Sequence, residues 1–101
     1  MKKVLLVGTG DVGKHLLEFA ARDESNLEWI VGDVDEERAR WACNNAEIGA
    51  AHHGKHPKFK PIQVDLFDGE RTTELIQKEK PDAIINCTGH LDTYDYVYER
   101  R

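Results

Sequence analysis

VLLVGTGDVG, residues 4–13, joins a short apolar run directly to a GxGxxG pattern. Four consecutive apolar residues are typical of a strand buried on both faces of a parallel sheet, and a helical pattern starts at the third glycine. In such a turn Gly8 permits the tight bend, Gly10 lets a pyrophosphate approach the backbone, and Gly13 lets the helix pack closely. Free N–H groups and the positive helix dipole would hold the phosphates. The stretch therefore predicts a dinucleotide-binding loop made by Gly8, Thr9, Gly10, Asp11, Val12 and Gly13.

An acidic residue in the expected place supports this prediction. Asp33 follows a second apolar run, 27–31, and lies 20 positions after Gly13, where a dinucleotide fold places its ribose-binding carboxylate. That carboxylate would accept hydrogen bonds from the adenosine ribose and repel a 2′-phosphate unless an arginine compensates. Val34 carries no charge, so we expect NAD in preference to NADP. NADP is the alternative, because Arg38 and Arg40 lie one to two helical turns further on and could reach a 2′-phosphate.

Asp33 has an alternative interpretation that needs no ligand. A carboxylate at this position is also typical of the N-cap of the following helix, and Asp35 could equally serve as that cap.

Alternating apolar runs and helical patterns predict the order βαβαβαβ. The expected strands are 4–7, 27–32, 61–65 and 83–87, and the expected helices are 11–22, 36–46 and 70–80. Asp11 is the expected cap of the first helix. The helical faces expected against the sheet are Val12, Leu16, Phe19 and Ala20 in the first helix, Ala39, Ala42, Cys43 and Ala46 in the second, and Leu75 and Ile76 in the third.

This alternation predicts an α/β fold of the Rossmann type, with a parallel sheet in strand order 3-2-1-4 and helices on both faces. Ligands bind such sheets at the carboxyl ends of the strands, beside strands one and four. The expected cofactor site therefore also includes the residues after strands two, three and four, namely Val34, Asp65, Leu66, Cys87, Thr88 and Gly89. Asp65 could contact adenine, or could be a turn aspartate before Leu66.

Composition restricts the class of protein. The chain has 101 residues, a net charge of −5, 40% hydrophobic and 33% charged residues, which is typical of one globular domain. The chain has no block of basic residues that would indicate nucleic acid as a partner. It also has no apolar run long enough to span a membrane. The lysines at 2 and 3 precede too short an apolar stretch for a signal peptide, so we expect a cytoplasmic protein.

The cysteines and histidines suggest no metal site. Cys43 and Cys87 form neither a CxxC pair nor a disulfide framework. His52, His53 and His56 lack a nearby acidic or thiolate ligand and HExxH spacing, so we interpret them as a solvated loop. Lys14 and His90 have no evident catalytic partner, and no catalytic residue is predicted.

Three segments carry a resemblance to a known family: GTGDVGKHLLEFAARD, WIVGDVDEERARWACNNA and IQVDLFDGERTTELIQKEKPDAIINCTG. They resemble the amino-terminal cofactor domain of the saccharopine dehydrogenase and reductase-like family over residues 2–90. The matching positions are Gly8, Gly10, Gly13, Asp33, Asp65 and Asn86. Two features depart from the family pattern: Val34 stands where many members carry a basic residue, and no proline follows strand four.

The resemblance implies an oxidoreductase domain that binds a nicotinamide dinucleotide, which we expect to be NAD(H). A dinucleotide fold normally continues into further strands that carry the substrate residues, so we expect a fragment of a longer protein that is inactive by itself, with a natural single-domain protein as the alternative. The segment 90–101 has Leu91, Tyr94, Val97 and Tyr98 at helical spacing, and the open sheet edge beside strand four suggests a homo-oligomer. Two other functions remain open. One is a regulatory domain that senses NAD(H) or a nucleotide without catalysis, and the other is a scaffold with an empty pocket.

Overall fold

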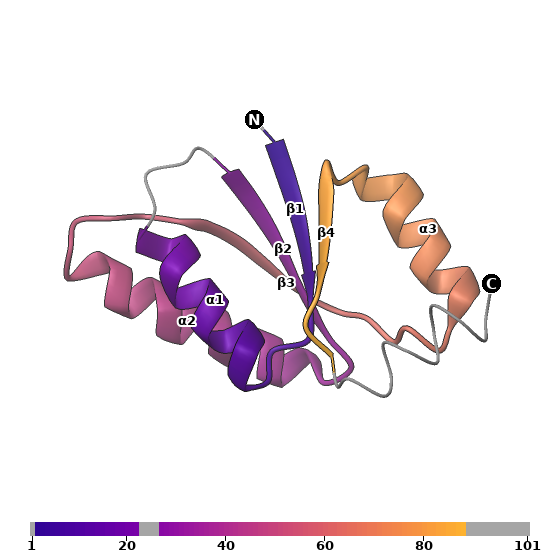
Figure 1. Cartoon of the computed structure of the whole chain (residues 1–101), viewed down its shortest axis with the longest axis horizontal. Coiled ribbons are helices and arrows are strands. Elements are labelled where there is room, and N and C mark those ends of the chain that lie inside the picture. The colour runs from indigo at the N-terminus through magenta and orange to yellow at the C-terminus, as the bar shows by residue number, and fades with distance from the viewer. Residues whose placement is uncertain (1, 23–26, 89–101) are drawn as a thin grey trace.

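The computed structural model describes residues 2–22 and 27–88 of the chain. They form a four-stranded parallel sheet in the order β3-β2-β1-β4, as predicted (Figure 1). The elements follow one another as β1 (Lys2–Val7), α1 (Asp11–Arg22), β2 (Leu27–Asp33), α2 (Glu36–Ala51), β3 (Lys58–Gln63), α3 (Gly69–Glu79) and β4 (Ala83–Asn86).

The central strand β1 supplies side chains to both faces of the sheet, which explains its uninterrupted apolar sequence. Val4 and Leu6 pack into a cluster with buried residues of α1 and α2. Leu5 and Val7 join a second cluster, against which α3 packs Leu75 and Ile76. Figure 1 shows the same division, with α1 and α2 on one side of the strands and α3 on the other. Helices therefore cover both faces, as the strand pattern predicts.

The predicted buried face of α1 is wrong. Leu17 and Ala21 are buried with Gly13, whereas Val12 and Phe19 are 70% and 76% exposed. Leu16 and Ala20, the other two predicted contacts, are only partly buried at the edge of the cluster. The reason is the close approach of Gly13 to the Gly8 carbonyl. It turns the helix so that residues four and eight positions after Gly13 face the sheet.

Helix α2 is longer than predicted, because its buried face continues through Ala46 to Ala50. The predicted contacts Ala39, Ala42 and Cys43 are buried as expected. His52 caps the carboxyl end of α2.

Strand β3 begins three residues before the predicted strand and ends at Gln63 rather than Asp65. Phe59 pairs with Trp29, and Pro61 lies opposite Val31 in the same register. Proline is tolerated here because β3 is an edge strand of the described sheet, where an N–H can be absent on the open side. Val64 still donates its N–H to the Asp33 carbonyl at 2.9 Å, which places the following residue, Asp65, at the edge of the sheet.

The last two elements differ from their predicted bounds by one residue. Helix α3 ends before Lys80, which adopts a left-handed conformation with φ of 49°. Strand β4 is one residue shorter at its carboxyl end than predicted. The predicted helical segment 90–101 lies outside the described residues.

Candidate functional site

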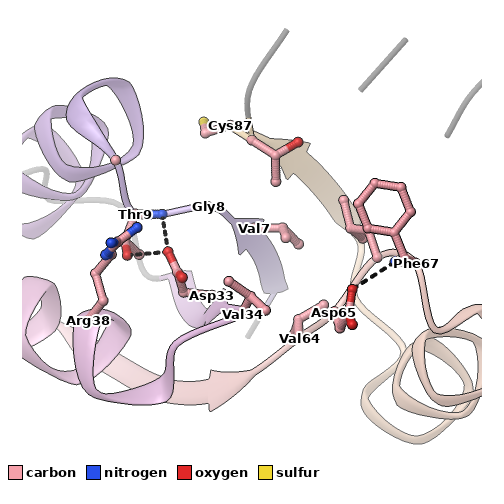
Figure 2. Close-up of a pocket in the computed structure, with 13 residues that line it drawn as sticks. Val7, Gly8, Thr9, Asp33, Val34, Arg38, Val64, Asp65, Phe67 and Cys87 are labelled. Atoms are coloured by element: carbon pink, nitrogen blue, oxygen red, sulfur yellow. Dashed lines mark hydrogen bonds between the residues drawn. The ribbon is translucent and has the colours of Figure 1, made fainter. Parts of the chain in front are cut away.

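A pocket of about 300 Å³ lies at the carboxyl ends of the strands, where the sequence places the cofactor (Figure 2). Most predicted site residues meet here, although they come from distant parts of the sequence. The pocket is lined by Val7, Gly8, Thr9, Gly10, Asp33, Val34, Arg38, Val64, Asp65, Leu66, Phe67, Cys87 and Thr88. Asp11, Val12 and Gly13 do not line it, because they form the first turn of α1 behind the loop. Gly89 lies outside the described residues.

Gly8 makes the sharp turn after β1 that the sequence predicts. Its φ is +98°, a conformation that side chains rarely adopt. A Cβ at Gly8 would also lie 2.7 Å from the carbonyl carbon of Cys87, so the loop and the end of β4 approach closely. The Gly8 N–H donates to the Gly32 carbonyl at 2.8 Å, which ties the turn to β2.

The other two glycines have different surroundings. A Cβ built on Gly10 meets no atom within 4 Å, and Gly10 lines the pocket. Gly13 faces the Gly8 carbonyl, where a Cβ would collide with the loop. Gly10 thus leaves space for a ligand, and Gly13 allows the helix to pack. Asp11 lies within the first turn of α1 rather than before it, and Lys14 donates its N–H to the Gly10 carbonyl at 2.8 Å.

Asp33 lines the pocket, but protein donors engage both of its carboxylate oxygens. Its Oδ2 accepts hydrogen bonds from the Thr9 N–H at 2.9 Å and the Thr9 hydroxyl at 2.6 Å, and its Oδ1 accepts from the Asp35 N–H at 3.0 Å. The residue is only 5% exposed. Burial by itself would raise the pKa of the Asp33 carboxyl, but these hydrogen bonds and the charge of Arg38 outweigh it and lower that pKa. Figure 2 shows the carboxylate turned towards Thr9.

Asp35, not Asp33, caps helix α2. Its side chain accepts from the N–H groups of Glu37 and Arg38, which is the geometry of an N-cap. The alternative interpretation of Asp33 as the cap is therefore wrong. Asp33 instead joins the end of β2 to the glycine loop.

One of the two arginines considered from the sequence reaches the pocket. Arg38 lines it together with Val34, and its side chain extends from α2 towards the loop at Thr9 in Figure 2. Within residues 2–22 and 27–88, no hydrogen bond or ion pair occupies its guanidinium. Arg40 instead bonds to Glu36 at 3.2 Å, one turn back along the helix. Arg38 is thus the available cation at this end of the pocket.

Asp65 has the turn role that the sequence predicted as one of two alternatives, and its contact with adenine stays a prediction. Its Oδ1 accepts the Phe67 N–H and its carbonyl accepts the Asp68 N–H, each at 3.0 Å, so it forms the turn before α3. It also lines the pocket beside Leu66 and Phe67. Phe67 lines the pocket without having been predicted from the sequence, although its place two residues after Asp65 could have indicated it. Val7 and Val64 were missed because their apolar side chains were assigned to strands alone.

The end of β4 is held by its own polar residues. Cys87 donates its N–H to the Val7 carbonyl at 2.7 Å. Asn86 Oδ1 accepts from the Thr88 N–H at 3.0 Å and from the Thr88 hydroxyl at 2.7 Å. Burial raises the pKa of the Cys87 thiol, so the thiol in the pocket is mainly protonated at neutral pH. Asn86 therefore holds Thr88, which lines the pocket, but does not line the pocket itself.

Among the residues that the structure describes, no three His, Cys, Asp or Glu side chains gather as a metal-binding group. None of the helices in the described ranges has the length and hydrophobicity needed to cross a bilayer.

Several known proteins are similar to this chain. A curated relative, the formate-dependent phosphoribosylglycinamide formyltransferase of Sulfurisphaera tokodaii, is 30% identical over 92 residues, covering 91% of this chain and 19% of the relative. Saccharopine dehydrogenase (L-Glu forming) from Saccharomyces cerevisiae superposes with a TM-score of 0.68 at 18% identity, covering 96% of this chain and 19% of the enzyme. A candidate short chain dehydrogenase from Shigella flexneri gives a TM-score of 0.63 at 20% identity, covering 87% of this chain and 39% of that one.

The two structural matches establish the fold, and the chain spans about a fifth of the length of the curated relative. The family comes from a family model that matches residues 4–97, described as the saccharopine dehydrogenase NADP binding domain. The chain belongs to this family, and it is accordingly a nicotinamide-dinucleotide-binding domain.

Proposed function

We propose that this chain binds NADP(H) as the cofactor domain of a longer oxidoreductase. The family description names NADP, contrary to the preference for NAD expected from Val34. The observation that carries the proposal is Arg38, an unpaired guanidinium within the described chain that lines the pocket beside an inward-turned Asp33. A guanidinium binds phosphate oxygens in a bidentate way.

The proposed pose assigns one ligand group to each part of the pocket. The pyrophosphate would lie over Gly10, where the backbone is open and the N-terminus of α1 is near. The adenosine would lie between Val34 and Leu66, with its 2′-phosphate at Arg38. A pocket of about 300 Å³ lies at the lower end of the range for small-molecule sites, so in this pose it would hold only the adenosine half of the dinucleotide. The nicotinamide half would therefore extend past Thr88.

Removing Arg38 tests this pose. Arg38→Ala should weaken NADP⁺ binding by roughly tenfold to a hundredfold, since a charge-assisted hydrogen bond contributes about 1.5–3 kcal/mol. Its effect on NAD⁺ binding should be small. Titration calorimetry of the 101-residue chain with both cofactors measures the two constants. Arg40→Ala is the matched control, because Arg40 lies on the same helix but is paired with Glu36. Tighter binding of NAD⁺ than NADP⁺ by the unsubstituted chain would contradict the NADP proposal.

The reaction of the whole protein belongs to the same proposal. The chain spans 19% of saccharopine dehydrogenase and 19% of the curated transferase, so we propose that it is one domain of a longer polypeptide. In that protein, other segments would supply the substrate and the catalytic groups.

A second candidate is a nucleotide-binding domain without hydride transfer. The curated relative favours it, because its name describes a transferase that acts on a phosphoribosyl compound rather than a dehydrogenase. Comparing NADP⁺ with adenosine 2′,5′-bisphosphate distinguishes the two candidates. Equal affinities would show that the nicotinamide half adds nothing and would favour the second.

A further inference from the structure

We infer that Thr9 is a specificity-determining residue that favours a 2′-phosphorylated cofactor by holding the Asp33 carboxylate away from the ribose. The inference rests on the proposed cofactor function. It concerns the second residue of the glycine loop, to which the glycine pattern itself assigns no chemistry.

The first step is the direction of the Asp33 oxygens. Both hydrogen bonds to Oδ2 come from one residue, Thr9, at 2.9 Å from its N–H and 2.6 Å from its hydroxyl. Oδ1 accepts the Asp35 N–H at 3.0 Å. Thr9 is itself only 4% exposed, so water does not compete freely for these bonds. The carboxylate is therefore turned towards Thr9 at the wall of the pocket, with most of its acceptor capacity taken by protein donors (Figure 2).

The second step is what this direction does to a ligand. A carboxylate binds the ribose diol of NAD by accepting its hydroxyl protons, which requires open lone pairs facing the ribose. In this structure three protein donors already engage those oxygens. The same three donors, together with the charge of Arg38, stabilise the ionised carboxylate and offset part of its repulsion of a 2′-phosphate. Asp33 thus offers fewer open lone pairs to a diol, and repels a phosphate less, than a carboxylate without these donors would.

The third step is the charge that remains at the pocket. Arg38 lines the same wall and lies close enough to Asp33 to favour its ionised form. Thr9 donates two hydrogen bonds to the carboxylate, and the Arg38 guanidinium forms no ion pair with it among the described residues. It stays available for an anionic ligand group, beside the N-terminal turn of α2. Thr9 would therefore act through Asp33 as a positioning residue.

Thr9→Val tests this role, because it removes the hydroxyl and keeps the branched shape. The freed Oδ2 lone pair should turn to the pocket and accept from the ribose diol. The ratio of NAD⁺ to NADP⁺ dissociation constants should then fall on the order of tenfold, which corresponds to the loss of one strong hydrogen bond. Thr9→Ser retains a hydroxyl and should keep the ratio of the unsubstituted chain within about twofold.

Two further measurements distinguish positioning from a merely structural effect. The pKa of the Asp33 carboxyl, followed by NMR, should rise in Thr9→Val, since a donor to the ionised form is lost while burial remains. In an Asp33→Asn background, Thr9→Val should no longer change the cofactor ratio. Persistence of the full change in that background would overturn the inference.

The remaining outcomes separate this inference from the proposed function. If the unsubstituted chain binds neither cofactor, the proposed function itself fails. If it binds NADP⁺ while Thr9→Val has an unchanged ratio, only the role of Thr9 is refuted. Circular dichroism establishes folding, and Thr9→Ala provides a smaller substitution if Thr9→Val unfolds. Unfolding of both variants would show that the Thr9 hydroxyl is required for the stability of the fold, and it would also overturn the inference.

Discussion

Gly10 and Gly8, two residues apart in the loop, should respond differently to an added side chain. A Cβ on Gly10 meets open space, whereas one on Gly8 meets the backbone of Cys87 and requires φ of +98°. Gly10→Val should therefore abolish dinucleotide binding and leave the thermal midpoint almost unchanged. Gly8→Ala should lower stability by at least about 1–3 kcal/mol, the cost of a strained backbone. Calorimetry and thermal melts measure the two effects. Normal cofactor binding by Gly10→Val would contradict the placement of the pyrophosphate.

The thiol of Cys43 should make stability fall in alkaline solution. Burial, with a smaller effect from Glu47, raises the pKa of this thiol to about 12, above the value of about 8.5 in an unfolded chain. Between these values the unfolded state binds fewer protons than the folded state, so stability decreases as pH rises, by about 1.4 kcal/mol per pH unit. The Cys43→Ala variant has no thiol at this position, so its free energy of unfolding does not fall with pH for this reason. Denaturant unfolding should show the free-energy gap between the two proteins narrowing by about 2 kcal/mol from pH 8.5 to 10. A constant gap would contradict the raised pKa.

At the scale of elements, the rotation of α1 can be tested with two of its apolar residues. Leu17 is 0% exposed and Phe19 is 76% exposed. Leu17→Ala should cost about 2–5 kcal/mol by leaving a cavity in the core. Phe19→Ala should change stability by about 0.5 kcal/mol or less, as at other surface positions. Urea unfolding measures both. A larger loss of stability in Phe19→Ala than in Leu17→Ala would support the helical face expected from the sequence and contradict the observed one.

At the scale of the whole molecule, we predict self-association through the edge of β4 that pairs with no other described strand. Within the described residues β4 pairs with β1 alone, and its Ile84 is 51% exposed. Unpaired edges and exposed apolar side chains favour pairing with another chain. Sedimentation should therefore show concentration-dependent dimers that Ile84→Lys abolishes. Ile48→Lys, at a residue 64% exposed on α2, is the matched control and should not alter them. A strictly monomeric chain at high concentration would contradict the prediction.

Local patterns predicted the parts of the fold that depend on neighbouring residues. The apolar run before Gly8 predicted a central strand, and alternating strand and helix patterns predicted the strand order 3-2-1-4. Right-handed crossovers leave few other arrangements for such a chain. The carboxyl ends of parallel strands meet at one edge, so Asp33, Asp65 and Cys87 could be assigned to one pocket. The structural role of Gly8 also followed from its place in the motif.

Tertiary packing decided what side-chain spacing could not. The turn of α1 that buries Leu17 and exposes Phe19 depends on the contact between Gly13 and the Gly8 carbonyl. The register of β3 depends on its pairing with β2, and for this reason the strand ends at Gln63 rather than at Asp65 as predicted. The direction of the Asp33 carboxylate depends on Thr9, 24 positions earlier in the chain. By itself, the sequence determined that an acid stands at the end of β2. Only the folded chain decided which donors its oxygens meet, because a hydrogen bond depends on distances between residues that no local pattern specifies.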